Sequence, residues 1–174
     1  MKGGLNMKNS GLSSAFVMLL FVPCLLVARP CAAQQQYVDR NHQETWSGVQ
    51  LHACPLSYAM AGANVKDNKF TCQRVVPKSE VAQVHSVLDS GTQKDFGRGN
   101  MHVCPEGTYM RGLHSGQNEL LCSSAPTVHL TSPFYDASGH TQGNAMHMCP
   151  VRLKKQTIMI GIHEGRNDFA CAFL

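Results

Sequence analysis

The sequence has few charged residues, since only 15% of its 174 residues are Asp, Glu, Lys or Arg, against about 25% in an average globular chain. Hydrophobic residues make up 43% of the chain, which is enough to build a core and argues against intrinsic disorder. A nucleic-acid-binding protein should show a basic patch or run, but the only close basic pair is Lys154-Lys155. We therefore expect no nucleic acid among the partners.

Motifs that would identify a chemistry are also missing. The chain contains no Cys-x-x-Cys pair of the kind that binds zinc, no Cys-x-x-Cys-His haem signature and no Asn-x-Ser/Thr acceptor. Histidines and serines are present, but no pattern joins them into the nucleophile, base and orienting group of nucleophilic catalysis. We therefore expect a protein that is not an enzyme, with no catalytic residue assigned, and keep a secreted hydrolase as an alternative.

Long apolar runs are absent apart from one near the start of the chain. The apolar residues 15–28 follow two lysines and precede small residues that end at Ala33, which is the layout of a secretory signal peptide. A membrane-spanning helix would need about 20 apolar residues. We predict a signal peptide over 1–33, a single repeat domain over 34–174, and a secreted or periplasmic protein without a membrane anchor. Removal of the signal peptide lowers the formal net charge from +4 to +1.

Cysteines are well represented in the predicted mature chain, which keeps six of the eight. An even number of cysteines in an exported protein indicates a disulfide framework. Six cysteines allow many pairings, and their number alone does not choose among them. The six are Cys54, Cys72, Cys104, Cys122, Cys149 and Cys171.

The predicted domain contains an internal repeat in three copies, at residues 51–72, 101–122 and 146–171. Each copy carries His-x-Cys-Pro, then Met-x-Gly, then Asn-x-x-x-Cys, and the glycine always lies ten residues before the second cysteine. The third copy is four residues longer between Cys149 and Met159, which indicates a loop. The simplest pairing of the cysteines keeps each disulfide within one copy. The predicted bonds are then Cys54–Cys72, Cys104–Cys122 and Cys149–Cys171.

This pairing sets a geometric condition on the strands. The first and third strands of a plain meander lie about 9–10 Å apart, whereas a disulfide joins Cα atoms separated by about 4.4–6.8 Å. The strand that ends in Cys-Pro must therefore pair directly with the last strand of its copy or fold over its end.

The composition of each copy favours strands over helices. The Met-x-Gly segments of the second and third copies are rich in β-branched and aromatic residues. Each is followed by three residues with a central glycine, Gly116 or Gly165, which is typical of a three-residue hairpin loop. Further strands are expected at 80–88, where a short helix is the alternative, and at 127–130. The threefold repeat of short strands predicts an all-β fold, β-trefoil-like or β-prism-like and stapled by disulfides, with a β-sandwich as the alternative.

Alternation of side chains along a strand predicts that the repeated residues share one face. With a hairpin loop at 115–117, His114 should lie opposite Asn118 and Gly112 opposite Leu120. The same register should place Met110 opposite Cys122. The repeated histidine and methionine side chains and the repeated glycine would then lie on the same face as the disulfide. They would either pack locally and bond the backbone at turns, or line three equivalent binding sites.

Metal binding is the functional interpretation of that shared face. Imidazole suits zinc and copper, and thioether sulfur suits Cu(I). We expect no cofactor, with copper or zinc as the alternative. The candidate ligand sets are His102, Met110 and His114 in the second copy and His147, Met159 and His163 in the third. Asn118 and Asn167 are placed to orient the imidazoles.

The leading functional expectation is an exported, non-enzymatic binding or structural module whose ligand contacts lie on loops. Copper or zinc binding is the first alternative. Trp46, the only tryptophan, is able to stack on a sugar, although sealing the core is the more ordinary role. A glycan or a protein is therefore a candidate partner.

Overall fold

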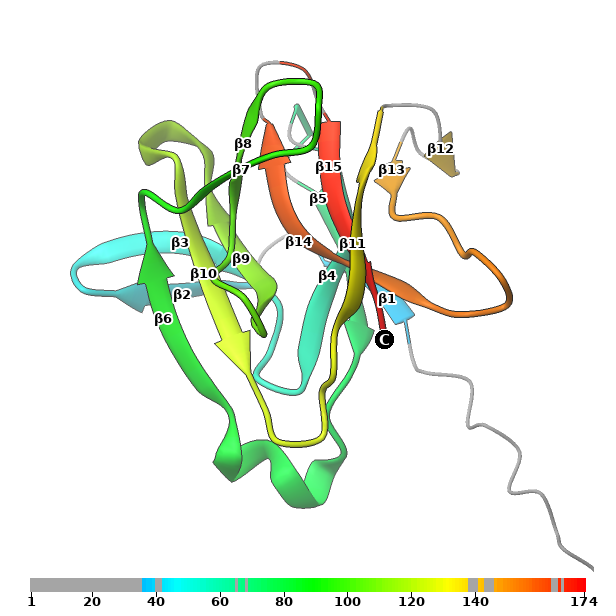
Figure 1. Cartoon of the computed structure of the whole chain (residues 1–174). Helices are drawn as coiled ribbons and strands as arrows, with labels where there is room; N and C mark the ends of the chain where they lie inside the picture. Colours follow the sequence, from blue (N-terminus) through cyan, green and yellow to red (C-terminus); the bar gives the residue numbers. More distant parts are fainter. Residues whose placement is uncertain are drawn as a thin grey trace, which may run out of the picture. The chain divides into compact units, whose positions relative to one another are not determined.

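The computed structural model describes residues 36–39, 42–64, 66–67, 69–137, 141–142, 146–163, 166 and 168–174. The predicted signal peptide over 1–33 lies outside these residues. The described chain is almost entirely β-structure and forms three five-stranded sheets (Figure 1). Two short 3-10 helices, η1 (Lys78–Gln83) and η2 (Ser115–Gln117), lie between strands.

The three sheets are antiparallel throughout. Sheet A contains, in spatial order, β1 (Gln36–Asp39), β5 (Lys69–Arg74), β4 (Tyr58–Asn64), β13 (Met146–Met148) and β12 (Thr141–Gln142). Sheet B contains β2 (Gln43–Trp46), β3 (Val49–Ala53), β9 (Tyr109–His114), β10 (Glu119–Ser124) and β6 (His85–Asp89). Sheet C contains β11 (Thr131–Asp136), β15 (Asp168–Phe173), β14 (Thr157–His163), β8 (Asn100–Val103) and β7 (Gln93–Asp95).

The copies of the repeat exchange strands. In each copy, the Met-x-Gly and Asn-x-x-x-Cys segments form a hairpin: β4–β5, β9–β10 or β14–β15. The His-x-Cys strand of that copy pairs instead with the hairpin of the next copy. Thus β3 lies along β9, β8 along β14, and β13 along β4. The exchange closes a ring, which confirms the all-β fold with a threefold repeat and gives three sheets rather than the two of a sandwich.

The three hairpins enclose a common core. Strands β4, β9 and β14 contact one another, and the buried side chains between the sheets come in equivalent threes. Apart from Tyr58, they are the six cysteines of the repeat, with Met60, Met110 and Met159, with Ala63, Leu113 and Ile162, and with Phe70, Leu120 and Phe169.

The three predicted within-copy disulfides are present. Their Cα atoms lie 5.6, 5.5 and 5.9 Å apart in copy order, which is ordinary disulfide geometry. The first cysteine of each copy follows a strand of one sheet, and the second lies in the hairpin of another sheet. Each bond therefore joins two sheets, and the long span of a plain meander is avoided because the strand that ends in Cys-Pro leaves its own hairpin.

The Met-x-Gly motif forms a β-bulge in all three copies. In the second copy Met110 lies opposite Cys122, as predicted, but Gly112 lies opposite Leu121, so that Arg111 is an extra residue. A bulge leaves the extra residue unpaired and shifts the alternation that follows it. The predicted register is therefore wrong by one residue beyond Met110.

The bulge also changes which residues share a face. Met110 and Leu113 both belong to the central core, so alternation turns His114 toward the outer face of its sheet. In the third copy, Met159 and Ile162 are the core residues, and His163 is turned outward in the same way. The prediction that the repeated methionine and this histidine lie on one face is wrong, because one residue intervenes.

The glycine of each motif lies where the exchanged strand crosses most closely. A Cβ atom on Gly161 would lie 2.4 Å from the carbonyl oxygen of His102 and 2.6 Å from Cγ1 of Val103. Gly62 and Gly112 are crowded in the same way by β13 and β3. The first cysteine of each copy then donates its amide to the bulge residue of the next copy. These bonds are Cys54 N to Arg111 O (2.8 Å), Cys104 N to Ile160 O (2.7 Å) and Cys149 N to Ala61 O (2.8 Å).

The turn of the second hairpin explains its repeated asparagine. His114 pairs with Glu119, so the loop covers 115–118 and is one residue longer than predicted. The residue in the left-handed region is Asn118, with φ 51°, rather than Gly116. Asparagine tolerates this conformation better than most residues do.

Two linking segments differ from the sequence prediction. The segment 80–88 divides into η1 and β6, so a helix and a strand both occur there. The segment 127–130 is not a strand and precedes β11.

Candidate functional site

In the second and third copies, the histidine of the His-x-Cys strand contacts an aspartate that the sequence analysis did not single out. Nε2 of His102 lies 2.8 Å from Oδ1 of Asp89, and Nε2 of His147 lies 3.0 Å from Oδ2 of Asp136. Both imidazoles are buried. Burial lowers the pKa of His52 below its usual value, and the negative charge of Asp39 partly opposes this effect. An aspartate therefore lies near this histidine in all three copies, and the two side chains are in contact in the second and third.

The three aspartates occupy equivalent positions at the ends of β1, β6 and β11. They lie opposite the core residues of the repeat, with Asp39 paired with Phe70, Asp89 with Leu120 and Asp136 with Phe169. The sequence contains one signal for this arrangement. An aspartate lies 13 residues before the histidine in the first two copies and 11 residues before it in the third.

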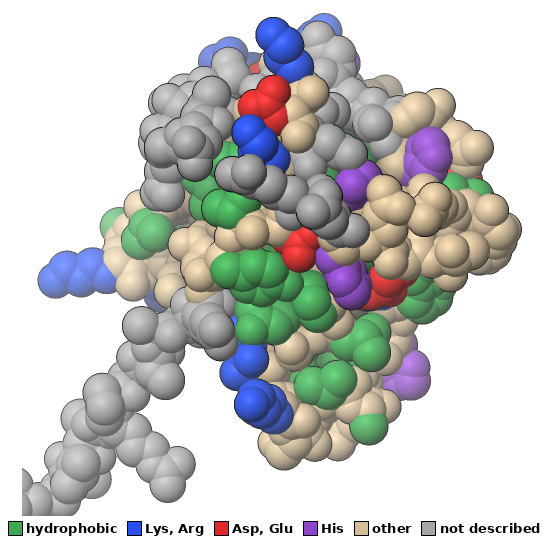
Figure 2. Space-filling view, turned by 180° about the vertical axis from the view of Figure 1, so that it is seen from behind, with side chains coloured by type: hydrophobic (Ala, Val, Ile, Leu, Met, Phe, Trp, Pro, Cys, Tyr) green, Lys and Arg blue, Asp and Glu red, His purple; other side chains and the backbone are tan. Residues whose placement is uncertain are grey.

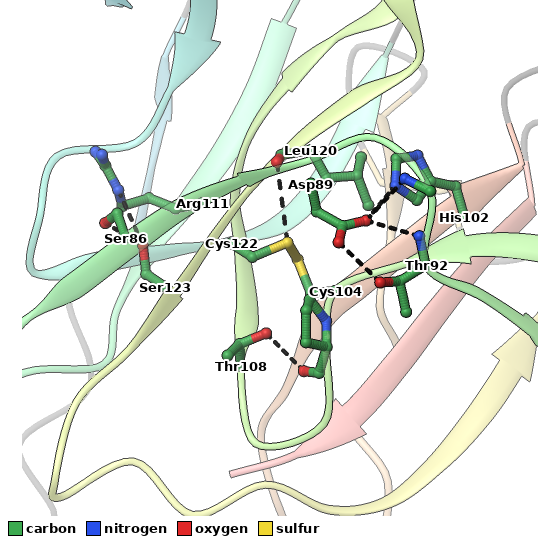
Figure 3. Close-up of a disulfide and its surroundings, with 12 residues drawn as sticks. Ser86, Asp89, Thr92, His102, Cys104, Thr108, Arg111, Leu120, Cys122 and Ser123 are labelled. Carbon is green, nitrogen blue, oxygen red and sulfur yellow. Dashed lines mark hydrogen bonds and ion pairs between the residues drawn. A yellow bond between two sulfur atoms is a disulfide. The ribbon is translucent and has the colours of Figure 1, made fainter. Parts of the chain in front are cut away.

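The second-copy pair is part of a larger network beside the Cys104–Cys122 bond (Figure 3). The Thr92 hydroxyl donates to Oδ2 of Asp89 at 2.8 Å, and the Thr92 amide donates to Oδ1 at 2.9 Å. Burial alone would raise the pKa of Asp89, but hydrogen bonds from His102 and Thr92 outweigh it and lower the pKa. The network fixes Thr92, which also lines the groove described below.

The structure does not gather the predicted metal ligands of the second copy around one point. His102 is held by Asp89, and its Nδ1 lies 3.4 Å from Oδ1 of Asn118, so the predicted contact with this asparagine is present. Met110 is enclosed in the central core. His114 accepts a hydrogen bond at Nδ1 from the Gln117 amide of its own turn.

The third-copy set has the same arrangement. His147 contacts Asp136 and stacks on Phe169 at 4.0 Å between ring centroids, while Met159 belongs to the core. His163 ends β14, and Asn167 lies outside the described residues. In the part of the chain that the structure describes, no three His, Cys, Asp or Glu residues gather as a metal site would require. Copper or zinc binding remains a prediction.

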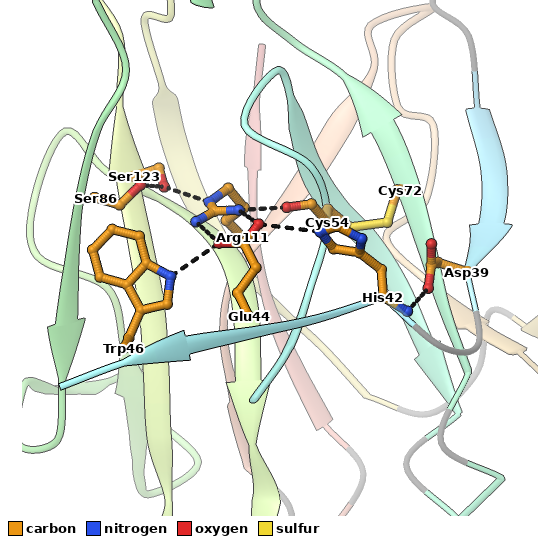
Figure 4. A network of polar contacts seen from close by, with 9 residues as sticks. All are labelled: Asp39, His42, Glu44, Trp46, Cys54, Cys72, Ser86, Arg111 and Ser123. Carbon is orange, nitrogen blue, oxygen red and sulfur yellow. Dashed lines mark hydrogen bonds and ion pairs between the residues drawn. A yellow bond between two sulfur atoms is a disulfide. The ribbon is translucent and has the colours of Figure 1, made fainter. Parts of the chain in front are cut away.

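A charged network occupies the outer side of sheet B (Figure 4). Arg111, the bulge residue of the second copy, is fully buried. Its two terminal nitrogens each lie 2.7 Å from a carboxylate oxygen of Glu44. Nη1 also donates to the Cys54 carbonyl at 2.6 Å, and Nε donates to the Ser123 hydroxyl at 3.2 Å. The two forked groups form a bidentate pair, which is the strong geometry for this kind of ion pair.

Trp46 covers this ion pair. Its Nε1 donates to Oε2 of Glu44 at 2.9 Å, and its ring lies 5.7 Å from the Arg111 guanidinium carbon. Burial alone would raise the pKa of Glu44, but the hydrogen bonds from Arg111, Trp46 and His42 and the charge of Arg111 lower it to about 2. The tryptophan thus packs in a polar network over a small apolar cluster.

A groove of about 450 Å³ lies on the outer face of sheet C. Its apolar lining comes from Val103, Leu130, Ile160 and Ala172, which also pack together beneath it. Polar side chains also line it, and two of these are charged. These polar residues are Thr92, Gln93, Lys94, Glu106, Thr108 and Ser132.

The groove and the Arg111 network occupy equivalent places in the two sheets. Gln43 pairs with His52 and Gln93 with His102, so Lys94 in sheet C corresponds to Glu44 in sheet B. The bulge residues correspond as well, because Ile160 takes the place of Arg111. The residue after the second cysteine is Ser123 in sheet B and Ala172 in sheet C. Arg111 therefore occupies in sheet B the position that is open in sheet C.

On the face seen in Figure 2, the Lys and Arg side chains drawn in colour form a few small groups and not one broad patch. None of the described helices is long and apolar enough to cross a membrane.

No family model, no curated protein and no solved structure matches the chain.

Proposed function

We propose that the protein is an exported, non-enzymatic binding module that holds a small ligand in the groove of sheet C. The observation that carries the proposal is the groove, because about 450 Å³ lies in the range of about 300–1,000 Å³ that is usual for small-molecule sites. An apolar floor with a few polar groups at the edge is also the usual composition of such sites.

The scaffold supports this role. Three disulfides join the sheets, and structural disulfides are typical of proteins in oxidising compartments such as the cell exterior or the periplasm. The groove lies between the exchanged strand β8, the hairpin β14–β15 and the segment that leads into β11. A binding site on strands that are held in this way is already shaped before the ligand arrives.

The polar groups at the groove are suited to binding. The Thr92 hydroxyl donates to Asp89, and the Thr108 hydroxyl donates to the Pro105 carbonyl at 2.6 Å. His102 contacts Asp89 rather than a hydroxyl that it would activate. These bonds orient the lining, which is what selective binding needs.

The test fills the groove with the side chains that sheet B uses. The double variant Ile160→Arg with Lys94→Glu should place an arginine in the position that Arg111 occupies in sheet B. The environment-sensitive dye 8-anilinonaphthalene-1-sulfonate should bind the natural protein with increased fluorescence, and the double variant should bind it at least tenfold more weakly. Lys155→Ala, in the turn 152–155 and not among the lining residues, is the matched control. Equal dye binding by the double variant and the control would show that the groove is not the binding site.

A further inference from the structure

We infer that the ligand of the groove is a small organic carboxylate with an apolar body. The inference rests on the proposed function and names the class of ligand for the same site. The contacts of Arg111 in sheet B show which residues surround this position, and the equivalent residues of sheet C show which ligand would fit there.

In sheet B the occupant is a cation and the residue that faces it is an anion. The Arg111 guanidinium lies against the Glu44 carboxylate, a backbone carbonyl and a hydroxyl, and it packs beside the Trp46 ring. A charged occupant is tolerated there, although fully buried, because an opposite charge and hydrogen bonds surround it.

In sheet C the three polar side chains of this arrangement are replaced, while an aromatic ring is kept in Phe96. Ile160 replaces the guanidinium and Ala172 replaces the hydroxyl of Ser123, so the floor offers apolar contact. Lys94 replaces Glu44, so the charge at the facing strand is reversed. An occupant that is complementary to these residues has an apolar body over the floor and a negative group at the end that carries Lys94.

The ammonium group of Lys94 is held at this end of the groove. Its Nζ lies 5.6 Å from the centroid of the Phe96 ring, and Phe96 follows Lys94 by two residues as Trp46 follows Glu44. The lysine is therefore supported by an aromatic ring in the way that the Arg111 guanidinium is. A ligand carboxylate would pair with this ammonium group.

Glu106 is the second charged residue of the lining. It belongs to the Cys-Pro turn of the second copy, whereas Lys94 belongs to β7, so the two charges enter the groove from different elements. The carboxylate group of the ligand should lie toward Lys94 and away from Glu106. Removal of the Glu106 charge should then strengthen the binding of an anion.

The apolar floor makes the length of the ligand body measurable. Burial of one methylene group strengthens binding by about fourfold. A series of straight-chain carboxylates from hexanoate to decanoate should therefore bind progressively more tightly until the groove is filled. A plateau in the series would give the length of the groove.

The experiment measures displacement of 8-anilinonaphthalene-1-sulfonate by decanoate, decanol and decylamine below their aggregation concentrations. We expect decanoate to bind at least tenfold more tightly than the other two. Lys94→Ala should remove this preference while the affinity for decanol stays within twofold. Lys94→Glu should favour decylamine, and Glu106→Gln should tighten decanoate binding. Lys155→Ala, which removes a lysine outside the groove, should leave all three affinities unchanged.

The outcomes separate this inference from the proposed function. If decanol or decylamine binds more tightly than decanoate, or if Lys94→Ala keeps the preference for decanoate, the carboxylate inference is overturned. The groove remains a binding site in that case, provided that Ile160→Arg with Lys94→Glu abolishes binding. If neither the dye nor any of the three compounds binds the natural protein, the proposed function itself is overturned.

Discussion

Protonation of Glu44 should release the charge that holds Arg111 in place, so Glu44→Gln is the variant from which we expect most information. The Glu44 side chain is 23% exposed and Arg111 is fully buried, so loss of the negative charge leaves an enclosed cation without its partner. Breaking a buried pair in this way costs about 3–5 kcal/mol. At neutral pH we expect the free energy of unfolding to fall by about 3 kcal/mol.

The pKa of Glu44 gives an independent magnitude. It falls from 4.5 to about 2, and one pKa unit corresponds to about 1.4 kcal/mol, so the ionised form stabilises the fold by about 3 kcal/mol. Because the pKa is lowered in the folded protein, this contribution is complete above about pH 4.5 and is lost as the pH falls toward 2. The difference between the natural protein and Glu44→Gln should therefore shrink across that interval.

The assay is urea unfolding with the disulfides intact at several pH values from 7 down to 2. Trp46 is the only tryptophan and contacts Glu44, so its fluorescence reports on the region that changes. His42→Gln, which alters a weaker partner of Glu44 at 3.2 Å, is the control and should change stability much less. A constant difference between the natural protein and Glu44→Gln from pH 7 to pH 2 would refute the argument, because the stabilisation would not depend on the carboxylate charge.

The remaining predictions concern the repeat. Gly161→Ala should destabilise the protein by more than about 2 kcal/mol, because its Cβ would clash with backbone of the exchanged strand, whereas Gly91→Ala, with no atom within 4 Å of the added Cβ, should be nearly neutral; equal melting temperatures would contradict the close crossing. Full reduction should lower the melting temperature strongly, since each disulfide contributes roughly 3 kcal/mol in the chain-entropy model; an unchanged value would show that the bonds do not staple the fold. On the copper or zinc hypothesis, calorimetric titration at pH 7.5 should show binding tighter than roughly millimolar that is lost in His114→Ala with His163→Ala; weaker binding, or binding that survives these substitutions, would reject the hypothesis.

The repeated motif allowed the fold class and the disulfides to be predicted. Three copies with equal internal spacing implied equivalent environments, and equivalent environments made within-copy bonds the simplest pairing. The hairpins followed from composition, as the pairing of Met110 with Cys122 shows. A local pattern does not show which strand pairs with the free edge of each hairpin. The exchange of His-x-Cys strands between copies was therefore not predicted, although it is the reason that the motif glycines are needed.

The candidate site was predicted less well, for two physical reasons. A bulge adds a single residue at Arg111 without any change of spacing within the repeat, so period-two reasoning placed His114 on the wrong face. The aspartates that contact the repeated histidines lie before the copies, in strands whose distance from the histidine differs in the third copy. The groove depends on Lys94 and Ile160, which come from elements far apart in the sequence and differ from their counterparts in the other copies.

The exchange of strands means that the closed ring requires three copies but does not require them to be in one chain. A peptide with a single copy and its preceding strand would carry its own disulfide, yet it would lack the His-x-Cys strand that completes its sheet and would present its own such strand without a partner. In a closed trimer of identical peptides, each His-x-Cys strand would pair with the hairpin of the next peptide. A dimer would leave one such strand and one hairpin edge unpaired. The covalent links between copies would then act mainly to raise the effective concentration of each partner.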